Sequence, residues 1–279
     1  MICAWNSLLN LLPPWMRPEV DKFGRQTLQD LRLRIHAPPE LQLLNGVKTL
    51  GRQVSAADLR FVINAATQYS PWTGESASRG YVTAAGGHRI GICGKAGSAT
   101  GYILSLQGIT SLCIRVSRDF EGIARNIPTE CSLLIIGSPG SGKTTMLRDL
   151  IRHISAVKTV AVVDEREEIF PRANGRFCYF TGEHTDVLSG CSKAQGVESV
   201  IRTMGPDVIA IDEITAAEDA KALLHAAWCG VLLVASAHAS SKQDFLSRPI
   251  YKPIAESGLF EQLLILRKDK SWYQERLHI

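Results

Sequence analysis

The chain has 279 residues, of which 45% are hydrophobic and 21% are charged, a balance typical of a globular protein that buries a sizeable core. Its net charge of +4 is too small to indicate a nucleic-acid-binding surface by itself. Seven cysteines without a Cys-x-x-Cys pair give neither a disulfide framework nor a zinc site, so we expect reduced and mostly buried thiols. No apolar run approaches the ~20 residues of a membrane-spanning helix, and we expect a cytoplasmic protein.

The first half of the chain has the pattern of an antiparallel α+β domain. Residues 2–16 lack the basic start of a signal peptide and predict a first helix that packs on its own domain. Alternating apolar residues predict a half-buried strand at 31–35, and a second extended run at 40–44 ends in an Asn-Gly turn. Ser55 then begins a helix, with Asp58 placed to complete a capping box.

A second hairpin is expected further along this half. Its strands are the extended runs at 81–84 and 88–92, which flank a Gly-Gly turn. Another alternating run follows at 112–116, before a short polar segment that ends the pattern. We therefore predict a smaller N-terminal α+β domain over residues 1–120.

The second half changes to short runs that are apolar on both faces, separated by segments of helix length. Such runs, alternating with helices, indicate a parallel sheet covered by helices on each side. We therefore predict an α/β domain over residues 121–279. Its expected strands are 133–136, 160–163, 208–211 and 231–235.

The first of these strands leads into a glycine-rich loop with the spacing G-x-x-x-x-G-K-[ST], followed by a helix. Glycines let the backbone pass close to a phosphate, and the N–H groups at a helix start favour an anion. Lys143 is expected to neutralise the β and γ phosphates of ATP, and Thr144 to bind Mg²⁺. The predicted ATP site is formed by Gly137, Ser138, Pro139, Gly140, Ser141, Gly142, Lys143, Thr144 and Thr145.

Carboxylates follow two of the expected strands. Asp212 is the expected Mg²⁺ ligand, and the adjacent Glu213 is expected to polarise the attacking water. A second acidic cluster begins at Asp164. Three roles are open for this cluster: tuning the water or metal, contacting a neighbouring subunit, or solvating a helix start. Either Asp164 or Glu165 could have a catalytic role, and we take Glu165 as the candidate catalytic residue.

Other side chains complete the candidate chemistry. His238 lies just after the expected strand 231–235, where a polar group can sense the γ-phosphate, although a packing role is the alternative. Hydrolysis by P-loop proteins often needs an arginine from a neighbouring subunit, worth ~10³–10⁵ in rate. The candidates for that role are Arg166, Arg172, Arg176 and Arg202.

Several segments together resemble the stage III sporulation protein AA family, which comprises ATPases of endospore-forming bacteria related to the secretion ATPases of type II and type IV systems. The resemblance spans nearly the whole chain. The phosphate loop is common to many families, whereas its combination with the acidic cluster and the glycine-rich hairpin is far more specific. The matching segments are 31–35, 39–41, 86–94, 114–115, 137–145, 162–168, 201–213 and 235–239.

The resemblance implies a RecA-like P-loop ATPase domain behind the smaller N-terminal domain, assembled as a homo-hexamer. It also implies that the protein powers a membrane-embedded transport complex between mother cell and forespore, and lies at the inner membrane through that complex. Asp164 and Glu165 match the acidic box of the secretion ATPases, and His238 matches their histidine box. Secretion ATPases usually carry Gly-Glu where this chain has Asp212 and Glu213, which makes this strand end closer to other RecA-like ATPases.

Functions of other classes remain as alternatives. The positive net charge and the basic run 267–270, beside Trp272 and Tyr273, favour a nucleic-acid-dependent RecA-like ATPase or helicase. Against this alternative, the sequence has no strongly basic stretch studded with aromatic residues, so nucleic acid is the less expected partner. A third reading is a nucleotide-gated scaffold with negligible turnover.

Overall fold

The computed structural model describes residues 1–68, 80–99, 102–173 and 175–277. The chain divides into two compact units. The first unit comprises residues 1–119 and 171–179, and the second comprises residues 120–170 and 180–279. The short segment 171–179 therefore lies in the second half of the sequence but packs as part of the first unit.

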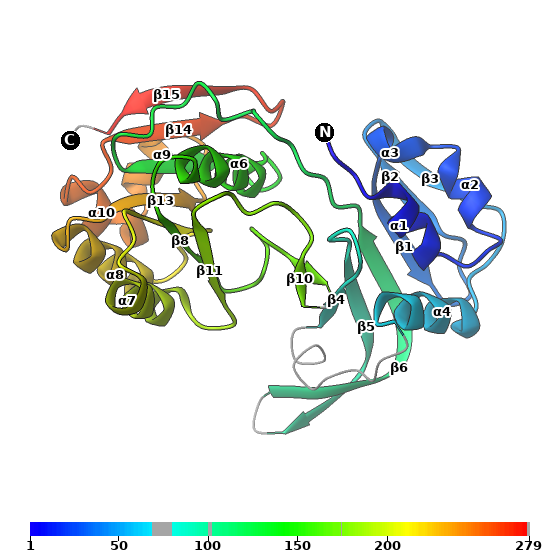
Figure 1. Ribbon diagram of the computed structural model, residues 1–279. Helices are drawn as coiled ribbons and strands as arrows, with labels where there is room; N and C mark the ends of the chain where they lie inside the picture. Colours follow the sequence, from blue (N-terminus) through cyan, green and yellow to red (C-terminus); the bar gives the residue numbers. More distant parts are fainter. Residues whose placement is uncertain (69–79, 100–101, 174, 278–279) are drawn as a thin grey trace. The chain divides into compact units, whose positions relative to one another are not determined.

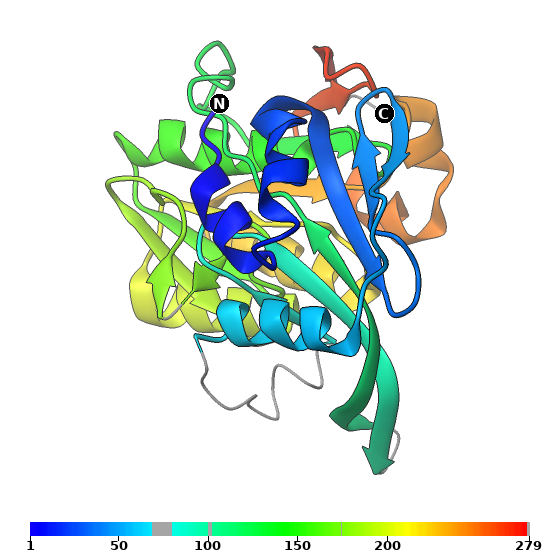
Figure 2. The same ribbon diagram turned by 90° about the vertical axis from the view of Figure 1, so that its right-hand side faces the viewer.

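The first unit is built on an antiparallel sheet with the strand order β3-β2-β1-β6-β5-β4 (Figures 1 and 2). Leu31 lies opposite Leu41 on one neighbouring strand and opposite Ile114 on the other. Both predicted hairpins are confirmed by antiparallel pairing. The strands are β1 (Leu28–Arg34), β2 (Glu40–Leu43), β3 (Gly46–Thr49), β4 (Tyr81–Thr83), β5 (Arg89–Ala99) and β6 (Tyr102–Arg115).

Helices pack on this sheet through one apolar core. Leu8 of α1, Leu59 of α4 and Leu33 of β1 belong to the same buried cluster, which confirms that the first helix packs on its own domain. The capping box is also confirmed, because the Ser55 N–H donates to Asp58 and the Asp58 N–H donates to the Ser55 hydroxyl. The helices are α1 (Trp5–Leu11), α2 (Arg17–Asp21), α3 (Gly24–Thr27) and α4 (Ala56–Ala66).

The segment 171–179 adds a two-stranded ribbon, β9 (Arg172–Ala173) and β10 (Arg176–Phe177), to the first unit. The Tyr179 hydroxyl bonds to the Ser117 hydroxyl, and the backbone at Gly87 passes close to the Tyr179 ring. These strands are too short to be predicted from sequence, because their position depends on contacts with distant residues.

The second unit contains a largely parallel sheet with the order β11-β8-β12-β13-β7-β14-β15 (Figure 1). The pairs from β11 to β14 are parallel, and β15 pairs antiparallel with β14 at the edge. All four predicted strands are confirmed. The strands are β7 (Leu133–Gly137), β8 (Val160–Asp164), β11 (Thr185–Ser189), β12 (Val208–Ile211), β13 (Leu232–Ala237), β14 (Gln262–Leu266) and β15 (Trp272–Arg276).

Helices cover both faces of this sheet, as expected for strands that are apolar on both sides. Leu147 of α6 packs with Ile135 of β7 on one face, whereas Leu223 of α8 packs with Ile136 on the other. Alternate residues of one strand thus face opposite helix layers. The helical elements are α6 (Lys143–Ser155), α7 (Lys193–Met204), α8 (Ala217–Trp228), α9 (Lys242–Ser247), η1 (Pro249–Tyr251) and α10 (Lys252–Glu256).

The expectation that most cysteines are buried is wrong. Cys93 and Cys229 are exposed and the others are only partly buried, although all are free of disulfide bonds. Cys93 follows the buried Ile92 on β5, and successive strand residues point to opposite faces. Apolar neighbours in sequence therefore do not imply burial of a cysteine on a strand. Within the described residues, none of the helices has both the length and the hydrophobicity needed to cross a bilayer.

Candidate functional site

The phosphate loop, defined as residues 137–145, connects β7 to α6 at the carboxyl edge of the parallel sheet. Pro139 and Gly140 occupy the middle of a tight turn in which the Ser141 N–H donates to the Ser138 carbonyl at 3.1 Å. Gly140 has a φ of 75°, as the third residue of a type II turn requires. At Gly137 a Cβ atom would lie 2.9 Å from the Leu266 carbonyl oxygen, so no larger residue fits there.

The loop ends in a helix start suited to an anion. Gly142, the N-cap of α6, has a φ of 104°. Within the described residues, no side chain caps this helix end, so its first N–H groups point toward the loop without a side-chain acceptor. A polyphosphate is the kind of ligand that such a helix start accommodates.

Lys143 is the buried cation of the site, with 8% of its surface exposed. Its ammonium donates to the Gly137 carbonyl at 3.0 Å and lies 3.0 Å from Nδ1 of His238. Burial lowers the pKa of Lys143, while the charges of Glu213 and Asp212 oppose that shift. The lysine is therefore held at the edge of the sheet beside both carboxylates.

Asp212 lies between a threonine and a serine. The Thr144 hydroxyl donates to one carboxylate oxygen at 2.7 Å, and the Ser236 hydroxyl donates to the other at 2.5 Å. β12 and β13 are paired neighbours in the sheet, which explains why the ends of both strands meet here. A hydroxyl and a carboxylate are oxygen ligands of the kind that Mg²⁺ binds in phosphoryl-transfer sites, so Thr144 and Asp212 could hold this ion.

Glu213 and His238 connect Ser236 with Lys143. The Glu213 N–H donates to the Ser236 hydroxyl at 2.9 Å, and its backbone has a φ of 48°, an uncommon conformation for a non-glycine residue. Nε2 of His238 contacts the Glu213 carboxylate. Nδ1 of the same ring faces the Lys143 ammonium, and because an ammonium can only donate, Nδ1 is the ring atom placed to accept. His238 therefore bridges the lysine and the glutamate.

The acidic cluster after β8 contains two different environments. Asp164 is 2% exposed and accepts hydrogen bonds from the N–H groups of Glu168, Ile169 and Phe170. Burial raises its pKa to about 6, against the effect of those hydrogen bonds. Glu165 instead forms an ion pair with Lys193 at 2.8 Å. Asp164 thus holds the following loop in place, and the ion pair of Glu165 joins it to α7.

The candidate arginines are scattered. Arg202 lies on α7 and pairs with Glu198 at 3.3 Å. Arg172 and Arg176 belong to the ribbon of the first unit, and Arg166 follows Glu165 in the acidic cluster. These four arginines therefore come from separate elements and from both units of the chain.

Some residues of the site were not singled out by sequence reasoning. Ser236 had no predicted role, although it lies between the expected strand 231–235 and His238. Tyr251 accepts a hydrogen bond from the His238 N–H at 3.1 Å. Lys193 contacts Glu165, and Lys270 contacts the phosphate loop at Gly140, each from a distant part of the sequence. No local pattern signals these contacts, because they depend on how the strands and helices meet.

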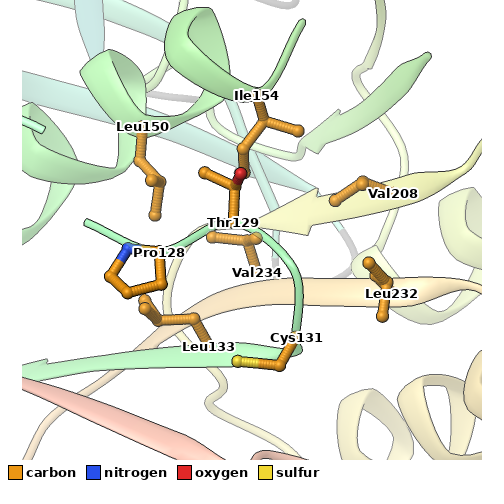
Figure 3. Close-up of a pocket in the computed structure, with 9 residues that line it drawn as sticks. All are labelled: Pro128, Thr129, Cys131, Leu133, Leu150, Ile154, Val208, Leu232 and Val234. Atoms are coloured by element: carbon orange, nitrogen blue, oxygen red, sulfur yellow. The ribbon is translucent and has the colours of Figure 1, made fainter. Parts of the chain in front are cut away.

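A separate pocket lies where the parallel strands begin, at the other end of the strands from the phosphate loop. Figure 3 shows the residues that line it. Leu133, Val208 and Leu232 are the first residues of their parallel strands, and they line this pocket together with Leu150 and Ile154 of α6. Apart from Thr129 and Cys131 its lining is apolar, and the lining residues include none of the phosphate loop. This pocket is therefore not the predicted nucleotide site.

Solved structures with a similar fold include secretion and pilus ATPases. The Legionella pneumophila ATPase DotB is 16% identical, with a TM-score of 0.52, and the match covers 95% of this chain and 80% of that chain. The pilus retraction motor PilT, solved with bound ADP, is 14% identical, with a TM-score of 0.60 and coverage of 95% and 78%. At this level of identity the likeness shows the fold, an α/β RecA-like domain with a smaller N-terminal antiparallel domain.

Sequence comparison gives a closer relationship. The family described as "Sporulation stage III, protein AA" matches residues 11–275. Stage III sporulation protein AA of Bacillus subtilis (strain 168) is 36% identical over 282 aligned residues, which cover 95% of this chain and 92% of that protein. The protein ycf45 of Cyanidium caldarium is 31% identical over 60% of this chain and 53% of its own length. The chain therefore belongs to the stage III sporulation protein AA family.

Proposed function

We propose that this chain is a Mg²⁺-dependent ATPase that binds ATP at the phosphate loop. The observation that carries the proposal is the connected set of side chains at one edge of the sheet. In this set Ser236 contacts both Asp212 and Glu213, and His238 contacts both Glu213 and Lys143. Thr144 joins the set through Asp212. The fold shared with ATPases such as DotB and PilT supports it.

The residues have distinct proposed roles. Lys143 exchanges its contacts with Gly137 and His238 for the β and γ phosphates, and Glu213 orients the attacking water and accepts its proton. Thr144 and Asp212 would hold a magnesium ion, which would neutralise part of the phosphate charge. His238 reports occupation by the γ-phosphate, since it touches both Lys143 and Glu213.

The remaining site assignments are also proposals. The rest of the phosphate loop, from Gly137 to Thr145, would cradle the phosphates with its backbone N–H groups. Glu165 would act as the second carboxylate, positioned by Lys193. An arginine from a neighbouring chain would stabilise the transition-state charge.

The family relationship supports a proposal for the biological role. The Bacillus subtilis relative carries a sporulation name, and we propose that this chain acts in sporulation as a homo-hexameric motor. Hydrolysis in the RecA-like domain, residues 121–279, would shift subunits, and the N-terminal domain, residues 1–120, would pass that motion to a membrane-embedded transport complex. The protein would then be cytoplasmic and held at the inner membrane by that partner complex.

Turnover by Glu213→Gln tests the catalytic proposal. We expect this variant to retain bound ATP in a filter-binding assay while phosphate release falls by about 100-fold or more, the size of a general-base contribution. Glu218→Gln, an exposed change on α8, should turn over as wild type does. Unchanged phosphate release by Glu213→Gln would refute the role. Strong stimulation of the wild type by DNA would favour the nucleic-acid-dependent alternative.

A further inference from the structure

The turn between β14 and β15 lies beside the phosphate loop. β14 pairs in parallel with β7, and Leu266, its last residue, is opposite Gly137. The chain turns at residues 267–271 and returns as β15 at the sheet edge (Figure 1). A Cβ atom added at Gly142 would lie 3.9 Å from Cδ of Lys270. The register of the sheet therefore places this turn against the loop.

Lys270 makes the polar contact between the two segments. Its ammonium donates to the Gly140 carbonyl, in the middle of the tight turn of the phosphate loop. Lys143 meanwhile donates to the Gly137 carbonyl. Two cations thus hold carbonyl groups of the same loop, one near its start and one at its tip.

The backbone of the turn is fixed in a form that does not favour lysine. The Lys270 N–H donates to the Arg267 carbonyl at 3.1 Å, and the Arg267 N–H donates to the Ser271 carbonyl at 2.9 Å. Asp269 accepts from both the N–H and the hydroxyl of Ser271. Lys270 has a φ of 73°, the left-handed conformation that glycine or asparagine usually supplies at this position of a hairpin.

Uncommon backbone conformations of non-glycine residues concentrate at functional sites. The contacts of the Lys270 side chain therefore bear on its role. Among the described residues, the Lys270 ammonium has one hydrogen-bond partner, the backbone carbonyl of Gly140 in the phosphate loop. The basic run 267–270, which from sequence alone favoured nucleic acid, thus places one of its charges beside the nucleotide loop instead.

We propose that Lys270 is a positioning residue for the bound nucleotide. It fixes the tip of the phosphate loop through the Gly140 carbonyl and adds a positive charge beside the polyphosphate. The inference rests on the proposed function, since it assigns a role in the same nucleotide site. Its ligand class is a nucleoside di- or triphosphate.

Affinity for ADP and ATP, measured by calorimetry on the full chain, tests this role. Lys270→Met should weaken both affinities about 3–10-fold, the effect expected for one charged but solvent-exposed contact. Lys270→Arg should recover most of the loss. Lys268→Ala removes the same charge from a neighbouring exposed position of the turn and should bind within about twofold of wild type.

Lys270→Gly separates positioning from folding. Glycine suits the left-handed backbone, so the thermal midpoint should equal or exceed that of wild type, while nucleotide affinity falls as in Lys270→Met. Wild-type affinity in both variants would overturn the proposal, as would an equal loss in Lys268→Ala. If wild type binds no nucleotide, or Lys143→Ala binds as well as wild type, the proposed function fails and this inference with it.

Discussion

Ser236 offers a sharp test of how the site is held together, because it is fully buried and serves both carboxylate residues. Its hydroxyl donates to Asp212 at 2.5 Å and accepts from the Glu213 N–H at 2.9 Å. Ser236→Ala removes both bonds without changing the shape of the backbone. The Glu213 N–H then loses its acceptor, and within the described part of the chain Asp212 keeps Thr144 as its one side-chain donor.

The magnitude follows from these two bonds. A hydrogen bond to a charged group contributes about 1.5–3 kcal/mol, and a buried N–H left unpaired costs about 1–3 kcal/mol. Since the two effects share one hydroxyl and are not additive, we expect Ser236→Ala to lower the free energy of unfolding by about 2–4 kcal/mol. Loss of a residue that orients a metal ligand should also weaken Mg²⁺ binding in the presence of ADP by about 10–100-fold.

Urea denaturation and a Mg²⁺ titration measure these two effects. Ser247→Ala is a matched control, since its exposed hydroxyl only donates to a backbone carbonyl; it should change stability by less than about 0.5 kcal/mol. If Ser236→Ala unfolds at the wild-type urea concentration and keeps wild-type Mg²⁺ dependence, the hydrogen-bonded arrangement around Asp212 and Glu213 is refuted.

Two further predictions concern the acidic cluster and its partners. The pKa of Asp164 is raised to about 6, above the value of about 3.9 in an unfolded chain, so the free energy of unfolding falls as pH rises between these two values. Asp164→Asn does not ionise, and its free energy of unfolding relative to wild type should therefore rise by up to about 3 kcal/mol between pH 4 and pH 6.5. A stability difference that does not vary with pH in urea titrations would contradict this. Lys193→Met leaves the carboxylates of Glu165 and the buried Asp219 without their cation, so it should lower unfolding free energy by about 3–5 kcal/mol. Lys252→Met, which breaks only an exposed pair, should cost less than about 1 kcal/mol, and equal losses in the two variants would show that burial does not set the effect.

The parallel sheet and the phosphate loop could be predicted from the sequence because each carries a local signal. Strands such as β8 (Val160–Asp164) are buried on both faces, so hydrophobicity alone marks them. The loop spacing is fixed by the close approach of backbone to phosphate. The positions of Asp212 and Glu213 followed from one rule, that parallel strands end at a common edge of the sheet.

Other features depended on contacts between distant residues. β11 (Thr185–Ser189) is only partly buried and polar in sequence, so it had no clear strand signal. The segment 171–179 packs with the first unit through partners such as Ser117. The pairing of Glu165 with Lys193 and the position of Lys270 beside Gly140 arise only when the sheet is assembled. The spacing of residues along the sequence does not reveal which distant residues come into contact in the folded chain.

Equilibrium binding of ATP in the presence of Mg²⁺ is the most direct test of the central claim, that the phosphate loop and its neighbouring strand ends form one nucleotide site. Calorimetry on wild type and Lys143→Ala compares a chain with and without the buried ammonium. We expect wild type to bind one nucleotide per chain, and Lys143→Ala to bind at least about 100-fold more weakly. Equal affinity in the two proteins, or no binding by wild type, would contradict the claim.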